Sequence, residues 1–248
     1  MIASDDSHRP WARPAGAWRM AMRWHDLLFA HWPVRAAELR PLVPGGLEIE
    51  TYSSTAWLGV IPFHMTGVRP RGVPALPWVS AFPELNVRTY VTAGGKPGVW
   101  FFSLDAGNRL AVEVARRWYH LPYFHARMRV EKEAGWLEYE SRRKGAPISS
   151  PPMFAGRFRP SGEEFRAQSG SLEYFLTERY SLYAADGRGG LYRAEIDHAP
   201  WPLQPAEAEI RVNTMTTPLG VGLPNTAPLL HFARRLDVVA WPLREADE

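Results

Sequence analysis

Alternating polar and apolar positions make residues 84–91 the most informative stretch of this chain. As a strand, the stretch presents two faces: Leu85, Val87, Thr89 and Val91 on one, and Glu84, Asn86, Arg88 and Tyr90 on the other. The glycine pair that follows predicts a tight hairpin, and residues 99–104 after it are apolar on both faces. A strand of that kind is normally covered on both sides, so the hairpin is expected to lie inside the molecule.

The hairpin brings the polar row beside a covered strand. Pairing through the turn is expected to set Tyr90 opposite Phe101, which places the row on the same face as an apolar side chain. Polar groups are costly inside a protein unless they satisfy one another or hold a ligand. The pattern therefore predicts an interior site lined by Glu84, Asn86, Arg88 and Tyr90.

Short strand-like segments separated by turns fill most of the remaining chain. Strands are expected over residues 24–32, 47–52, 56–68, 123–131, 136–143, 178–184, 192–198, 208–214 and 229–241. Helical spacing predicts helices over 33–40 and 109–118 and a helical turn over 172–176. Many short antiparallel strands with two or three short helices indicate an α+β fold built on a curved sheet, a sandwich or a partial barrel.

Composition agrees with one globular domain. The chain has 248 residues, and 46% of them are hydrophobic, which is enough for a substantial core. Residues 1–20 are polar at their start and are expected to be poorly ordered, whereas residues 21–248 are expected to form a single domain. No apolar run has the length of a membrane span and no signal peptide is evident, so we expect a cytoplasmic protein without a membrane partner.

Charge and cysteine content exclude several function classes. The net charge is +3, but the basic residues are scattered singly or in pairs, so no nucleic-acid partner is expected. The chain contains no cysteine, which excludes disulfides, thiolate metal sites and a cysteine nucleophile. No His-Glu-x-x-His pattern and no complete dinucleotide loop are present, so we expect neither a metal nor a cofactor.

Three residues outside the polar row, His198, Trp201 and Arg179, are further candidates. Strand parity over residues 192–198 turns His198 toward the apolar side, where it could act as a base or a ligand donor, or could be a core histidine bonded to the backbone. Trp201 lies in the proline-containing, and therefore rigid, segment that follows His198. Arg179 could clamp an anion, although pairing with a carboxylate of a neighbouring segment is the commoner arrangement.

These segments also carry a resemblance to a known family. The motifs are Phe82-Pro83-Glu84-Leu85-Asn86-Val87-Arg88-Thr89-Tyr90-Val91, Gly98-Val99-Trp100-Phe101, Leu121-Pro122-Tyr123, Arg179-Tyr180 and His198-Ala199-Pro200-Trp201. In this order they resemble the YqjF-like bacterial family of unknown function, from about Trp24 to Trp241. That family is similar, more distantly, to the acetoacetate decarboxylase-like superfamily. The resemblance implies a single β-rich α+β domain in which a strongly curved antiparallel sheet wraps a central cavity.

The resemblance does not extend to the chemistry of the superfamily's founding enzyme. That enzyme decarboxylates a β-keto acid through a Schiff-base lysine. Its lysine pair follows a proline in a segment similar to residues 121–124, where this chain has Tyr123 and Phe124. The three lysines present, at positions 96, 132 and 144, are expected at a hairpin turn, a strand end and a loop.

We therefore expect a cavity that binds, and could transform, a small organic acid or carbonyl compound without a Schiff-base lysine. The catalytic candidates are Glu84, Arg88 and His198, and the ligand-binding candidates are Asn86, Tyr90, Tyr123, Arg179 and Trp201. An enzyme of this kind would perform lyase-like acid–base chemistry on a keto or hydroxy acid. The alternative is a non-catalytic binding or structural protein in which the same groups satisfy one another. A homo-oligomer is compatible with either reading.

Overall fold

The computed structural model describes residues 6–77, 79–147 and 150–246, apart from the side chains of residues 114 and 115. The described strands are β1 (Met20–Val34), β2 (Glu48–Ile49), β3 (Ala56–Pro70), β4 (Phe82–Ala93), β5 (Lys96–Ala106), β6 (Tyr123–Glu133), β7 (Trp136–Arg143), β8 (Met153–Pro160), β9 (Ser181–Ala185), β10 (Leu191–Asp197), β11 (Leu203–Asn213), β12 (Leu229–Ala240) and β13 (Arg244–Glu245). The described helices are short: α1 (Ala36–Leu39), α2 (Arg109–Tyr119), α3 (Leu172–Thr177) and the 3₁₀ turns η1 (Arg40–Leu42) and η2 (Thr217–Leu219). None of them is long and apolar enough to cross a membrane.

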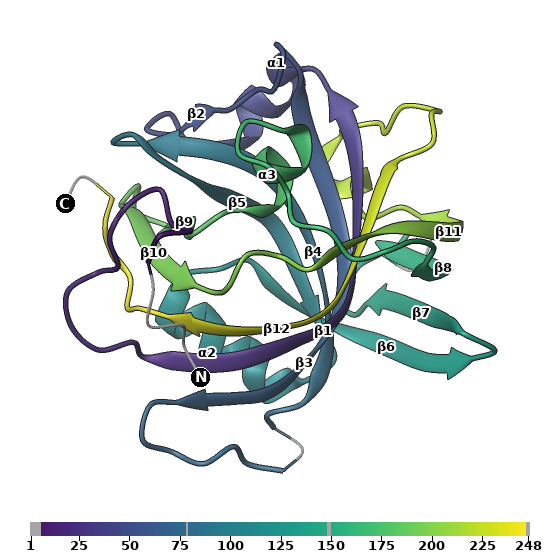
Figure 1. Cartoon of the computed structure of the whole chain (residues 1–248), viewed down its shortest axis with the longest axis horizontal. Helices are drawn as coiled ribbons and strands as arrows, with labels where there is room; N and C mark the ends of the chain where they lie inside the picture. Colours follow the sequence, from purple (N-terminus) through teal and green to yellow (C-terminus); the bar gives the residue numbers. More distant parts are fainter. Residues whose placement is uncertain (1–5, 78, 148–149, 247–248) are drawn as a thin grey trace.

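The strands form one sheet that closes on itself. Their order is β13-β10-β9-β5-β6-β7-β8-β11-β12-β1-β3-β4-β2, and β10 also pairs with β12 while β5 also pairs with β4. The two additional pairings close a ring that runs β10-β9-β5-β4-β3-β1-β12 (Figure 1). The single β-rich α+β domain with a strongly curved sheet is therefore confirmed.

Two strand pairings depart from the expected antiparallel pattern. Strand β5 runs parallel to β6 and to β9. A parallel neighbour requires the chain to cross back to the starting edge, and α2 provides this connection between β5 and β6. Hydrophobic periodicity identifies a strand but not its direction, so the sequence pattern could not predict these parallel pairings.

A sharp bend in β1 helps to close the ring. Asp26 has a positive φ of 50°, and the register against β3 shifts between His25 and Ala30. An interruption of this kind bends a strand and increases its twist. In Figure 1 the first part of β1 lies along the bottom of the view and the rest rises toward α1. One strand thus contributes to two sides of the ring.

The polar row on β4 is buried on the face that we expected, with a different register. The turn is the two-residue pair Gly94-Gly95, and it sets Tyr90 opposite Val99 and Arg88 opposite Phe101. The predicted pairing of Tyr90 with Phe101 is wrong, because it assumed a turn placed further along the chain. A register shift follows between Val87 and Arg88, yet the row keeps its inward face.

The opposite face of β4 packs into the main hydrophobic core. Leu85 and Val87 are fully buried there, together with Tyr139 and Phe158 of the β7–β8 pair. Both faces of β4 are therefore covered, which explains why the side chains of the polar row are buried. The β6–β7 hairpin projects from this side of the molecule (Figure 1).

The N-terminal segment contacts β10 through Arg9, and the poor order expected for residues 1–20 stays a prediction. Residues 1–5 lie outside the described residues, but Arg9 is only 7% exposed. Its guanidinium lies 3.0 Å from Asp197 and 3.1 Å from Glu195. Both carboxylates are on β10, and composition alone could not indicate that they would bind this segment.

Candidate functional site

A cavity of about 350 Å³ lies inside the ring of strands, and most of the side chains in its wall are apolar. The pairing of β3 with β4 orders its wall: Met65 faces Phe82, Phe63 faces Glu84, Ile61 faces Asn86, and Gly59 faces Arg88. At about 3.3 Å per residue, the six steps from Phe82 to Arg88 cover roughly 20 Å of backbone. The polar row is thus spread along the length of the cavity.

The mouth of the cavity lies beyond Phe82. Strand β3 continues past this level to Pro70, and the following loop and α2 carry five exposed apolar side chains that line the cavity. We call these five residues the apolar rim: Val73, Leu76, Val79, Leu110 and Trp118. The opposite, inner end is polar, since Arg88, Thr177, Arg179 and His198 line the cavity there.

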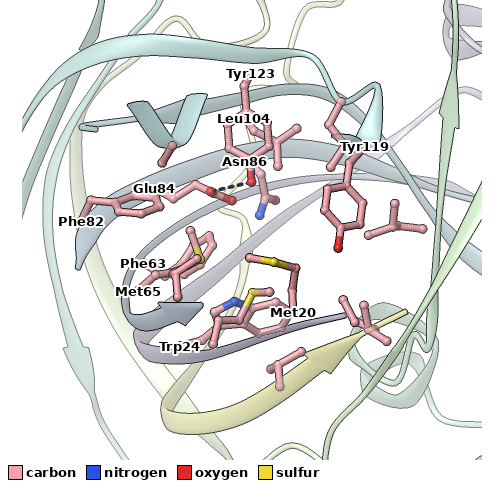
Figure 2. A pocket seen from close by; sticks show the side chains of 18 of the residues that line it. Met20, Trp24, Phe63, Met65, Phe82, Glu84, Asn86, Leu104, Tyr119 and Tyr123 are labelled. Atoms are coloured by element: carbon pink, nitrogen blue, oxygen red, sulfur yellow. Dashed lines mark hydrogen bonds between the residues drawn. The ribbon is translucent and has the colours of Figure 1, made fainter. Parts of the chain in front are cut away.

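Glu84 lies midway along this axis. Its carboxyl group is buried, and the hydroxyl of Tyr123 donates a hydrogen bond of 2.9 Å to Oε2 (Figure 2). Burial raises the pKa of Glu84 to about 8, the Tyr123 hydrogen bond opposes this, and the charge of Asp105 adds to it. At neutral pH Glu84 is therefore mostly protonated and is able to donate a proton into the cavity.

Two uncharged polar groups point into the same space without a partner. The side-chain oxygen of Asn86 and the hydroxyl of Tyr119 are buried and form no hydrogen bond with described residues. Figure 2 shows both facing the cavity, opposite Met20 and Trp24. Burial raises the pKa of Tyr119 to about 12, so this hydroxyl keeps its proton at neutral pH. Both groups are placed to bond a ligand.

Arg88 is a buried cation without a carboxylate partner among the residues that the structure describes. It is 9% exposed, and one terminal nitrogen donates to the Leu176 carbonyl at 3.1 Å and to the Tyr90 hydroxyl at 3.4 Å. Its Nε forms no hydrogen bond. The guanidinium also lies 5.7 Å from the ring of Phe29. In the structural alternative the polar groups satisfy one another, but Glu84 and Arg88 form no ion pair with each other.

Other candidates at the inner end are satisfied within the protein. Arg179 forms an ion pair with Glu50 and donates to the Phe175 carbonyl at 2.6 Å, which is the commoner arrangement considered from the sequence. Tyr90 lies behind the wall, where its hydroxyl donates to the Leu176 carbonyl at 2.8 Å and contacts His31 at 2.6 Å. These residues hold the inner end in place.

His198 lines the cavity as strand parity indicated, but its ring nitrogens face backbone carbonyls. They lie 2.9 Å from the Ala199 oxygen and 3.3 Å from the Arg179 oxygen. Burial lowers its pKa, so the ring is neutral at neutral pH. The ring stacks on Tyr180 at 4.6 Å. This arrangement favours a positioning role, because neither nitrogen is open to a ligand.

Trp201 forms part of the wall next to His198. Its backbone N–H donates to Glu178 at 2.8 Å, and its indole stacks on Trp24 with ring centroids 5.7 Å apart. The indole N–H of each tryptophan is buried without a hydrogen-bond partner. Sequence reasoning identified Trp201 but missed Trp24, Glu178, Tyr119 and the apolar rim, because side chains from distant strands and loops carry no common periodicity.

The described residues of the cavity wall provide no cluster of metal ligands and no lysine that could form a Schiff base. Within the described ranges, no group of three or more histidine or acidic side chains could hold a metal ion. The residues that line the cavity include no lysine among those described. Lys96 instead binds Glu195 at 2.9 Å, and Lys132 binds Asp26 at 2.7 Å.

The ring-like sheet around the cavity has an acetoacetate decarboxylase-like fold. The structure of acetoacetate decarboxylase from Legionella pneumophila superposes with a TM-score of 0.63 at 10% identity, covering 97% of this chain and 93% of that one. The enduracididine biosynthesis enzyme MppR complexed with pyruvate gives a TM-score of 0.63 at 8% identity, covering 94% and 92%. At such identities the likeness shows the fold.

Sequence similarity identifies the family. The chain belongs to the DUF2071 family, described as an uncharacterized conserved protein, whose model matches residues 21–237. It is 51% identical over 232 residues to the uncharacterized protein YqjF of Bacillus subtilis (strain 168), with 94% of each chain covered. The resemblance found in the sequence motifs is thereby confirmed.

Proposed function

We propose that this protein binds an organic acid in the cavity, with the carboxylate held by Arg88. The observation that carries this proposal is the buried Arg88 guanidinium, which faces the cavity without a carboxylate partner among the described residues. A buried charge is costly unless it is paired, and a ligand carboxylate would supply that pair. One terminal nitrogen is occupied by the Leu176 carbonyl and the Tyr90 hydroxyl, and the other forms no hydrogen bond with a described residue and would bind the carboxylate.

The middle of the cavity supports acid–base chemistry on the bound acid. Glu84 is mostly protonated at neutral pH and accepts the Tyr123 hydrogen bond, so its own proton is available to a carbonyl or leaving oxygen. Once ionised, the carboxylate is able to take a proton from carbon or oxygen in the reverse direction. Asn86 and Tyr119 also line the cavity, and each has a buried polar atom without a hydrogen-bond partner among the described residues. Lyase-like chemistry on a keto or hydroxy acid fits these groups and needs no lysine.

The second candidate is a non-catalytic binding protein. It is favoured by the inner-end contacts in which Arg179 pairs with Glu50 and His198 faces two backbone carbonyls. In that case Arg88 still anchors the ligand, but Glu84 serves only as a hydrogen-bond donor. Cytoplasmic location and assembly into a homo-oligomer remain predictions.

A thermal-shift screen of carboxylic acids tests the proposal. A ligand at a hundred times its dissociation constant adds about 2.7 kcal/mol of stability. For a domain of this size, that corresponds to a rise in melting temperature of roughly 5–11 °C. We expect at least one keto, hydroxy, aromatic or aliphatic acid to give such a shift, and its amide to give none. The shift should disappear in Arg88→Met, measured against that variant's own baseline. A hit that survives Arg88→Met would remove the anchor.

A further inference from the structure

The apolar rim and the polar inner end together restrict the kind of acid that this cavity accepts. All five of the exposed large hydrophobic side chains in the described part of the chain line this one cavity. Their exposed fractions run from 37% for Val79 to 64% for Leu110. Soluble proteins scatter single exposed hydrophobic residues, whereas a concentration at one opening marks a binding surface.

The wall between the two ends is also apolar and adaptable. On the β1 side it is formed by Met20, Met22 and Trp24, and on the β3 side by Met65 and Val68. Unbranched methionine side chains fill irregular space and adjust to different apolar ligands. A short keto acid bound at Arg88 would leave this part of the wall without a partner.

The rim also carries cationic side chains. The guanidinium of Arg19 lies 5.5 Å from the ring of Trp118, and that of Arg71 lies 5.2 Å from Trp18. Positive charge beside an apolar opening attracts an anionic ligand and raises its rate of entry. The charge of the opening is therefore compatible with the anion expected at Arg88.

We propose that the ligand is an amphipathic monocarboxylic acid, with its carboxylate at Arg88 and its apolar chain running past Asn86 and Glu84 to the apolar rim. This inference rests on the proposed function and specifies its substrate class. If a heavy atom takes about the 30 Å³ of a water molecule, the cavity of about 350 Å³ holds roughly 12 heavy atoms, as in a saturated acid of about ten carbons.

Calorimetric titration with a series of straight-chain acids tests this inference. Butanoate, hexanoate, octanoate, decanoate and dodecanoate are compared with pyruvate, acetoacetate and the primary alcohols of matching length. Each added methylene should tighten binding about fourfold, until the chain fills the cavity near decanoate. The alcohols should bind weakly because they lack the anion. Pyruvate or acetoacetate binding as tightly as decanoate would overturn the inference and leave the proposed function intact.

Rim variants provide the second arm. Leu76→Ser combined with Leu110→Ser alters two exposed side chains, so the fold should not be affected. We expect this variant to weaken decanoate binding about fivefold to twentyfold and to leave hexanoate binding unchanged. Glu140→Ser, at an exposed position of β7, is the control and should change neither. Equal losses for both acids, or none for decanoate, would contradict the assigned path. Absence of binding by every acid would overturn the proposed function itself.

Discussion

Glu84 shows how burial gives a carboxyl group a pKa that suits acid–base chemistry. Its strand neighbours Leu85 and Val87 anchor β4 in the core, so the carboxyl group has to remain on the cavity face. There it has one hydrogen bond and no cation partner among the described residues. The resulting pKa of about 8 is the property that an acid–base residue needs near neutral pH.

The raised pKa of Glu84 predicts a definite pH dependence of stability. The folded state keeps the proton up to about pH 8, whereas the unfolded chain loses it near 4.5. The folded state therefore binds more protons within this window, and the free energy of unfolding falls as pH rises through it, by at most about 1.4 kcal/mol per pH unit. Below pH 4.5 and above pH 8 the contribution is constant.

Glu84→Gln isolates this contribution, because other groups titrate equally in both proteins. We expect the wild type to lose about 3–5 kcal/mol relative to Glu84→Gln between pH 4.5 and pH 8. Urea denaturation at several pH values measures the difference. A difference that does not change with pH would show that the carboxyl group is ionised in the folded protein.

Arg143 and Arg88 are both buried, and comparing them tests what an ion pair with a carboxylate contributes to stability. Arg143 binds Asp105, with contacts of 2.7 and 3.0 Å to the same oxygen, and Asp105 is fully buried. Arg143→Met should cost about 3–5 kcal/mol because it leaves that charge unpaired. Arg88→Met leaves no carboxylate unpaired, and the Leu176 carbonyl keeps its bond from Tyr90. We expect its cost in unfolding free energy to be about 1 kcal/mol or less.

Chemical denaturation of both variants without ligand separates the two cases. A loss of several kcal/mol in Arg88→Met would indicate that a carboxylate partner exists in solution, and it would weaken the argument for a ligand anion.

At the scale of elements, alternation in the sequence predicted which side chains of β4 share a face, but both faces of β4 and of β10 carry buried side chains. Side chains in a strand alternate, so apolar positions identify the core face and fix the others by parity. Parity could not predict the pairing partners. The turn at Gly94-Gly95 and the shift near Arg88 moved each cross-strand neighbour, and the partner of Arg143 comes from a different strand. Contacts of this kind form only when the sheet closes into a ring, and the pattern of a single strand does not specify them.

The N-terminal segment makes a contact with β10 that composition does not indicate. Arg9 links residues before β1 to β10, and its guanidinium lies 4.9 Å from the ring of Tyr180, which stacks on His198. The segment therefore supports the wall of the site from outside. A polar, proline-containing sequence is typical of a loose end, but buried carboxylates on another strand supply its binding energy.

Removal of the Arg9 guanidinium should destabilise the protein measurably. Arg9→Met weakens the neutralisation of Asp197 and Glu195, although Lys96 still contacts Glu195. We expect a cost of about 1.5–3 kcal/mol in the free energy of unfolding. Arg129→Met breaks an exposed pair with Glu131 and should leave stability unchanged within the error of the measurement. Equal effects in urea denaturation would show that the segment is not held by Arg9.

At the scale of the whole molecule, the closed ring creates a cavity from side chains that are distant in the sequence. The polar row could be predicted because it lies on one strand, and the family motifs added the fold. Tyr119, Trp24 and the apolar rim could not, because each comes from a separate element and is brought in by curvature. The parallel pairings of β5 have the same origin.

The position of the bound carboxylate is the most direct test of the account. A high-resolution crystal structure with the tightest-binding acid from the titrations would show it. We predict that both carboxylate oxygens lie about 2.7–2.9 Å from the Arg88 guanidinium, with the rest of the ligand extending past Asn86 and Glu84. A carboxylate bound at the rim beside Arg71, with Arg88 untouched, would contradict the central claim.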